Sequence, residues 1–111
     1  MLSLIEQIKA RVQSLSASEL IATDYAKNRA AQRGISLNQA CENILFNPGA
    51  FWKLSSFNGV LGRRVEVYLR VSPRNAHKYV LEVNSSVFLI NAMNINTRIQ
   101  KRLKRYEKRF V

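Results

Sequence analysis

One segment sets the fold class of this chain, Arg64-Val65-Glu66-Val67-Tyr68-Leu69-Arg70-Val71. Apolar and polar side chains alternate through it with a period of two, which predicts a strand that buries one face of a sheet. The valines and the leucine belong to the buried face, whereas Arg64, Tyr68 and Arg70 belong to the opposite face. Before residue 48 the apolar residues recur at helical spacing instead, so we expect a helical half followed by a sheet.

The helical half begins with two predicted helices. The first covers residues 2 to 15, where apolar side chains at helical spacing form one stripe, and a short connector follows. The second begins near Thr23 or Asp24, either of which can cap backbone N–H groups. It ends at Gly34, because glycine most easily takes the left-handed conformation after a last helical turn.

A third helix and the sheet complete the predicted order of elements. Ser36 and Gln39 match a capping box at the start of this helix, which stops at Asn47-Pro48-Gly49. Two further strands, at 78–83 and 87–93, follow the segment quoted above, and residues 51–57 are a candidate edge strand.

The predicted class is therefore α+β, with N-terminal helices packed on a three- to four-stranded antiparallel sheet and a basic C-terminal helix. Within one domain, 1–111, we expect an extra N-terminal helix at 1–17, a helical part at 18–48, the antiparallel sheet at 50–95 and the basic helix at 97–111.

The last fifteen residues give the clearest indication of function. Ile99, Leu103, Tyr106 and Phe110 recur at steps of four, three and four, which predicts one apolar face of a helix. Against the single acid Glu107, the other faces carry seven cations: Arg98, Lys101, Arg102, Lys104, Arg105, Lys108 and Arg109. Such a surface favours a polyanionic partner.

The composition supports the same interpretation. The chain has 111 residues, 18 Lys and Arg, and 7 Asp and Glu, so its formal charge is +11. Phosphate backbones attract such a protein, and no apolar run approaches the roughly 20 residues that a membrane-spanning helix needs. Cys41 is the only cysteine and His77 the only histidine, so we expect a reducing cytoplasm, no disulfide within the chain, no structural zinc and no cofactor.

Residues 23–35, Thr-Asp-Tyr-Ala-Lys-Asn-Arg-Ala-Ala-Gln-Arg-Gly-Ile, resemble the motif Thr-x-His-Ala-x-x-Arg-Met-x-x-Arg-Gly-Ile of a poorly characterised bacterial and archaeal family. That family is similar to RelE/ParE-type toxins, whose fold groups with barnase-like nucleases. Arg29 and Arg33 match the motif, whereas Tyr25 stands where the family has His. The resemblance covers roughly residues 20 to 95 and implies a RelE-like fold and a small, metal-independent endoribonuclease that binds RNA on its sheet. It also implies a partner that neutralises the enzyme.

RNA cleavage without a metal needs a base, an acid and a cation near one phosphate. If the two central strands pair, His77 or Tyr79 is expected within reach of Arg70 or Tyr68. The hypothesis makes His77 the acid or base, and Arg64 and Arg70 the phosphate clamp, with Tyr68 beside them. Arg74 and Lys78 join the seven C-terminal cations as candidate nucleic-acid contacts.

Structural roles compete with each of these assignments. His77 at a strand start is more often exposed and structural, and alternating Arg and Tyr are often only the solvated face of a sheet. Arg29 and Arg33 are candidates for ion pairs with Asp24, Glu42 or Glu66, which we favour over RNA contact, and we favour Tyr25 as a packed aromatic over a proton donor.

The predicted function is a toxin-like endoribonuclease that acts on RNA, including ribosome-bound message, with an acidic antitoxin as partner. The alternative is a non-catalytic nucleic-acid-binding protein that uses the same basic surface, such as a ribosome- or nucleoid-associated protein. The first helix is a candidate for homodimer formation or for binding a partner.

Overall fold

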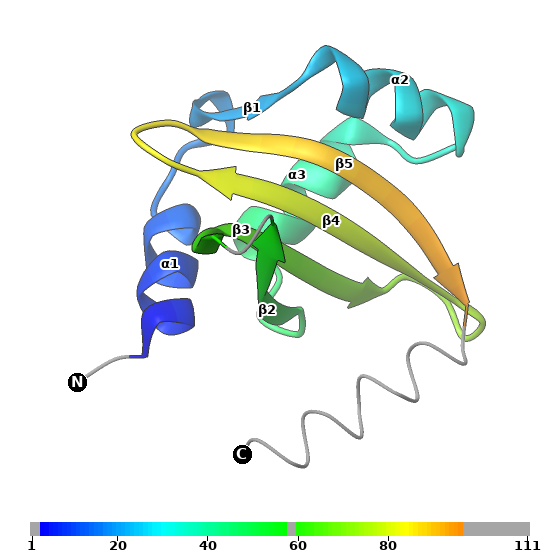
Figure 1. Cartoon of the computed structure of the whole chain (residues 1–111). Coiled ribbons are helices and arrows are strands. Elements are labelled where there is room, and N and C mark those ends of the chain that lie inside the picture. The colour runs from blue at the N-terminus through cyan, green and yellow to red at the C-terminus, as the bar shows by residue number, and fades with distance from the viewer. Residues whose placement is uncertain (1–2, 58–59, 97–111) are drawn as a thin grey trace.

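A computed structural model describes residues 3–57 and 60–96, and it confirms the α+β class (Figure 1). Within these residues, three α-helices and five strands follow one another, with a single turn of 3₁₀-helix, η1, before the first strand. The elements are α1 (Leu4–Gln13), η1 (Ala17–Glu19), β1 (Leu20–Ala22), α2 (Asp24–Gln32), α3 (Leu37–Phe46), β2 (Phe51–Phe57), β3 (Val60–Arg70), β4 (Asn75–Val83) and β5 (Val87–Asn96). The basic helix predicted at 97–111 lies outside the described residues.

The sheet corrects two parts of the prediction, because it has five strands and is mixed. The strand order is β1-β5-β4-β3-β2, and β1 runs parallel to β5 while the other pairs are antiparallel. β1 lies inside the segment 18–48 that we expected to be wholly helical. It is only three residues long, which is too short for a period of two to show in the sequence.

The central strands confirm the predicted alternation of the core side chains, although Tyr68, predicted on the opposite face, is buried as well. Val65, Val67 and Leu69 are buried, whereas Val71 lies beyond the end of β3 and is exposed. β4 begins before the range predicted for it, and β5 continues beyond the end of its predicted range. In the described part of the chain, residues 51–57 do form an edge strand, which pairs with β3.

Helices α2 and α3 begin and end where their capping residues predict, whereas α1 is shorter at both ends than the predicted range 2–15. The Thr23 side chain accepts a hydrogen bond from the Ala26 amide at 3.1 Å, and Gly34 has φ of 67° just after α2. Ser36 likewise accepts from the backbone N–H of Gln39. The Gln39 side chain donates to Asn43 instead of completing the capping box, so only the Ser36 half of that prediction is correct.

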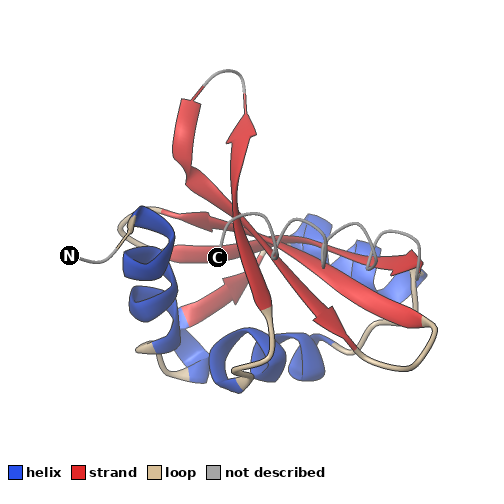
Figure 2. Ribbon diagram, turned by 90° about the horizontal axis from the view of Figure 1, so that it is seen from below, coloured by secondary structure: helices blue, strands red, loops and turns tan. Residues whose placement is uncertain are grey.

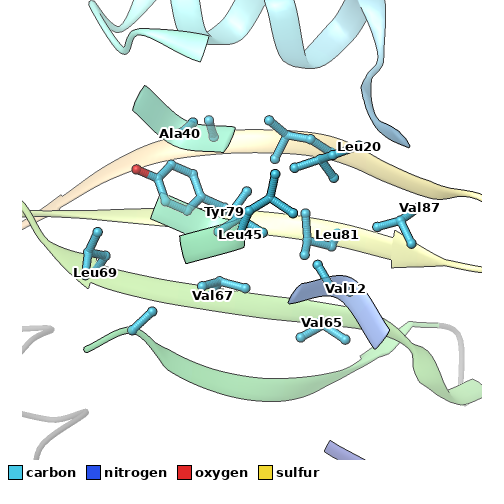
Figure 3. Packing of buried hydrophobic residues seen from close by; sticks show 14 of the residues in the cluster. Val12, Leu20, Ala40, Leu45, Val65, Val67, Leu69, Tyr79, Leu81 and Val87 are labelled. Atoms are coloured by element: carbon cyan, nitrogen blue, oxygen red, sulfur yellow. The ribbon is translucent and has the colours of Figure 1, made fainter. Parts of the chain in front are cut away.

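The larger of two hydrophobic clusters in the described residues lies between the sheet and helices α1 and α3, which cover the same face (Figures 1 and 2). The smaller cluster consists of Tyr68, Ala76 and Ile95, with Phe51 packed against it. Figure 3 shows the larger cluster, which we call the core, from close by. Val12 of α1 and Leu45 of α3 pack there with Val65, Val67, Tyr79 and Leu81 from the strands.

Helix α2 has a different position, alongside β5 at the edge of the sheet (Figure 1). β1 pairs only with residues 87 to 89 of β5. Beyond that point Arg33, at the end of α2, donates to the backbone carbonyl of Ala92 at 2.7 Å. Strand and helix together therefore cover an edge that would otherwise present unpaired carbonyl groups.

Candidate nucleic-acid interface

The pairing of β3 with β4 decides which predicted site residues share a face. Arg64 is opposite Glu82, Tyr68 is opposite Lys78, and Leu69 is opposite His77. Directly paired residues project to the same side of a sheet. We therefore call Arg64, Glu66, Tyr68, Arg70, Lys78 and Glu82 the charged face, and it is the side opposite to the core.

His77 and Tyr79 lie on the other side of the sheet, which is a correction. The two strands do pair, as expected, but His77 shares its face with Leu69 and the core, not with Arg70 or Tyr68. The predicted group of His77, Arg64, Arg70 and Tyr68 is therefore divided between two faces. A sheet separates these side chains, so they cannot act on one phosphate.

Instead, His77 belongs to a buried polar network. Its Nδ1 lies 2.8 Å from the hydroxyl of Tyr79, which accepts a hydrogen bond from the Asn43 amide at 2.9 Å. Burial lowers the pKa of His77 from its ordinary value, and a hydrogen bond with Asn94 opposes this effect in part. Burial also raises the pKa of Tyr79, so its hydroxyl stays protonated at neutral pH.

On the charged face, opposite charges are paired. The Lys78 ammonium lies 2.9 Å from the Glu66 carboxylate, which also accepts a hydrogen bond from the Tyr68 hydroxyl at 3.0 Å. Burial, followed by the negative charge of Glu66, raises the pKa of Tyr68, so this hydroxyl acts as a donor and not as a base. Arg64 and Glu82 form a longer pair at 3.9 Å.

Two more of the predicted cations lie at the turn between β3 and β4, Arg70 at the end of β3 and Arg74 in the turn itself. The Arg70 guanidinium donates to the backbone carbonyls of Ser72 and Pro73, at 3.2 and 2.8 Å. Arg70 therefore stabilises the turn, whereas Arg74 lies exposed on it. The seven C-terminal cations predicted to bind nucleic acid lie outside the described residues.

Arg29 and Arg33, the two arginines of the motif, donate hydrogen bonds to neutral groups. The prediction that they form ion pairs with carboxylates is therefore wrong. Arg33 donates to the Asn91 side chain at 3.0 Å as well as to the Ala92 carbonyl, and it thereby fixes α2 to β5. Arg29 donates to the Tyr25 hydroxyl at 3.0 Å, and its guanidinium lies 5.2 Å from the centre of the Tyr25 ring.

Tyr25 is exposed, which corrects our preference for a packed aromatic. Its exposed fraction is 53%, at the start of α2. Together with Arg64 it lines a groove of about 500 Å³ beside the charged face, which we call the Tyr25 groove. The other described residues that line it are Thr23, Ser55, Glu66, Val80, Ile90 and Asn91.

The Tyr25 groove brings together two signals that were separate in the sequence. Tyr25 comes from the motif and Arg64 from the alternating strand, and only the packing of α2 against β5 places them at one groove. Ser55 and Asn91 were not predicted as site residues, since single polar residues in strands carry no spacing signal. The groove offers an aromatic ring, a guanidinium and neutral polar groups, which are the groups that bind a base and a phosphate, and its one carboxylate, Glu66, is paired with Lys78.

Two further properties bear on ligands and location. Among residues 3–57 and 60–96, no three His, Cys, Asp or Glu side chains gather where they can hold a metal ion. In the same residues, every helix is too short or too polar to cross a lipid bilayer.

Comparison with known proteins found no matching family model, no similar curated protein and no similar solved structure. The resemblance to RelE/ParE-type toxins therefore stays a prediction from the motif of residues 23–35.

Proposed function

We propose that this chain binds single-stranded RNA in the cytoplasm, with the Tyr25 groove as the site that receives a base and its phosphate. One observation carries the proposal: an exposed tyrosine and an arginine from distant parts of the chain line the same groove. Stacking on an aromatic ring contributes about 1–3 kcal/mol per base and works with any base. A single strand suits this site because its bases are free to leave the stack.

The groove can also accommodate a phosphate. Arg64 and Glu82 are 3.9 Å apart with side chains about one-third exposed, and such pairs at a surface contribute little to stability. A phosphate oxygen that accepts from Arg64 would compete with this weak ion pair. The net charge of +11 attracts the RNA backbone, and much of that charge comes from residues 97–111, which follow β5 directly in the sequence.

Binding assays with the full chain test this proposal. We expect fluorescence anisotropy to show binding of a labelled single-stranded RNA that weakens as salt is raised. Tyr25→Ala should reduce the affinity about tenfold, the loss of one stacked base, and Arg64→Gln should also reduce it. Tyr25→Phe keeps the ring and should bind like the native chain.

The matched control for charge is Arg11→Gln, which removes one cation from α1, away from the Tyr25 groove. The proposal is wrong if Tyr25→Ala binds RNA as tightly as the native chain. It is also wrong if Arg11→Gln and Arg64→Gln reduce the affinity for RNA by the same factor. Equal binding of single-stranded DNA would leave the groove in place and remove the preference for RNA.

A second candidate function is a toxin-like endoribonuclease neutralised by an acidic antitoxin. One observation favours it: the carboxylate of Glu66 lines the same groove as Arg64 and Tyr25. In this form of the hypothesis Glu66 is the base, Arg64 holds the phosphate and the Tyr25 hydroxyl is the acid, in place of His77.

RNA end-mapping after induced expression distinguishes the two functions. New RNA ends that disappear in Glu66→Gln and Tyr25→Phe, but persist in His77→Gln, support cleavage in the groove. RNA binding without new ends supports the non-catalytic protein.

A further inference from the structure

The buried network around Tyr79 connects two parts of the surface. Gln39 is exposed on α3, and its amide donates to the side-chain oxygen of Asn43 at 3.0 Å. Asn43 in turn donates to Tyr79, which is fully buried, and Tyr79 is 2.8 Å from Nδ1 of half-buried His77. His77 is opposite Asn94 in the pairing of β4 with β5.

The hydrogen bonds in this network have a single direction. Because the Tyr79 hydroxyl accepts from Asn43, its own proton is left to donate, and the His77 ring nitrogen is the acceptor within reach. Nδ1 must then carry no proton, so a neutral His77 is protonated at Nε2. The donor groups of Gln39, Asn43 and Tyr79 therefore all point toward His77, which accepts the last hydrogen bond.

A proton on Nδ1 conflicts with this direction. His77 would then donate to the Tyr79 hydroxyl, which would accept twice and leave its own proton unpaired in the core. A buried donor without a partner is costly. The conflict is removed if the Asn43 amide turns so that its oxygen faces Tyr79, and if Gln39 then turns so that its oxygen faces Asn43.

We propose that Gln39, Asn43, Tyr79 and His77 form a relay of hydrogen bonds that reverses when His77 gains a proton. The reversal changes the hydrogen-bonding groups at the surface, since Gln39 and Asn43 line a groove of about 370 Å³ on α3 with the exposed Phe46. When His77 is neutral, Gln39 points its NH₂ group inward and offers an acceptor oxygen outward. When His77 is charged, Gln39 offers a donor.

The surroundings of His77 permit this behaviour. The lowered pKa of His77 comes from burial and is opposed only by Asn94, so no charged side chain among the described residues determines it. On β3 the residue opposite His77 is the apolar Leu69. The titratable group on α3 is Cys41, beside Tyr79, and the charged residue at the end of α2 is Arg33, whose backbone carbonyl accepts a hydrogen bond from Asn94.

NMR titration of the isotope-labelled full chain tests the relay, and His77 is the only histidine, so its ring signals need no assignment. We expect the neutral ring to be protonated at Nε2, with a midpoint below the ordinary value of about 6.5. The side-chain amide signals of Gln39 and Asn43 should shift with the same midpoint. In Tyr79→Phe, His77 should still titrate, while the Gln39 amide should no longer follow it.

Tyr25→Phe is the matched control, because it removes a hydroxyl outside the relay and should leave both signals unchanged. The native chain decides the proposal even if Tyr79→Phe fails to fold. A neutral His77 protonated at Nδ1, or a Gln39 amide that does not titrate with His77, would overturn it. Neither outcome bears on RNA binding, so this proposal and the proposed function fail separately.

Discussion

At the scale of single residues, the pairing register of β3 and β4 determines which side chains lie on the same face of the sheet. The sequence shows which residues of β3 alternate, but it does not show which residue of β4 lies opposite each of them. A shift of one residue in the pairing moves every side chain of a strand to the other face. His77 opposite Leu69 faces the core, whereas Lys78 opposite Tyr68 joins the charged face.

The burial of His77 makes the stability of the protein depend on pH. Because its pKa is lower in the folded chain than in the unfolded chain, the unfolded chain takes up the proton first as the pH falls. The contribution of His77 to the free energy of unfolding should therefore be constant above about pH 6.5, should fall as the pH drops from there toward the lower pKa of folded His77, and should level off below that pKa.

Urea unfolding at pH 7.5 and pH 5.5 measures this effect. The native chain should unfold at a lower urea concentration at pH 5.5, and His77→Gln should lose most of the difference. A native chain that is equally stable at both pH values would contradict the sign of the pKa shift.

At the scale of elements, local capping was predictable and pairing was not. Thr23, Gly34 and Ser36 each act through neighbours a few residues away, so their roles follow from the sequence. β1 depends on contacts with β5, more than sixty residues later, and its three residues carry no pattern of their own. The Tyr25 groove depends on that packing too, which explains why Tyr25 and Arg64 were predicted for different roles.

The end of α2 offers a direct test of local structure. Gly34 has φ of 67° with no atom within 4 Å of an added Cβ, so a substitution meets backbone strain and no steric clash. Gly34→Ala should lower the free energy of unfolding by about 1–2 kcal/mol, the cost of the left-handed conformation for an L-residue.

Chemical denaturation of Gly34→Ala and Gly34→Asn provides the measurement and its control. Asparagine tolerates the left-handed conformation better than alanine does, so Gly34→Asn should be the more stable variant. An alanine variant as stable as the native chain would show that α2 ends in another way.

At the scale of the whole molecule, charge is divided between two regions. In the described part of the chain, two carboxylates of the charged face pair with Arg64 and Lys78. Residues 97–111 hold seven cations and one acid. We therefore expect the groove to hold one base by stacking, and the C-terminal cations to supply most of the salt-dependent attraction.

The salt dependence of RNA binding tests this division. Replacing Lys101, Lys104, Arg105 and Lys108 together by Gln should lower the slope of log affinity against log salt by about 3, at about 0.7 per single-strand phosphate contact. Tyr25→Ala should lower affinity equally at every salt concentration. An unchanged slope in the fourfold variant would show that these cations do not contact phosphate.

The parallel pair of β1 and β5 also constrains how the chain acquires its structure during synthesis. Leu20 meets Val87 in that pair, so the edge beside α2 is completed only after nearly all of the described chain has been made. Contacts between residues so distant in sequence close slowly. Until then the sheet that covers Ile8, Val12 and Ile44 is incomplete, and we expect the nascent chain to be most prone to aggregation in that interval.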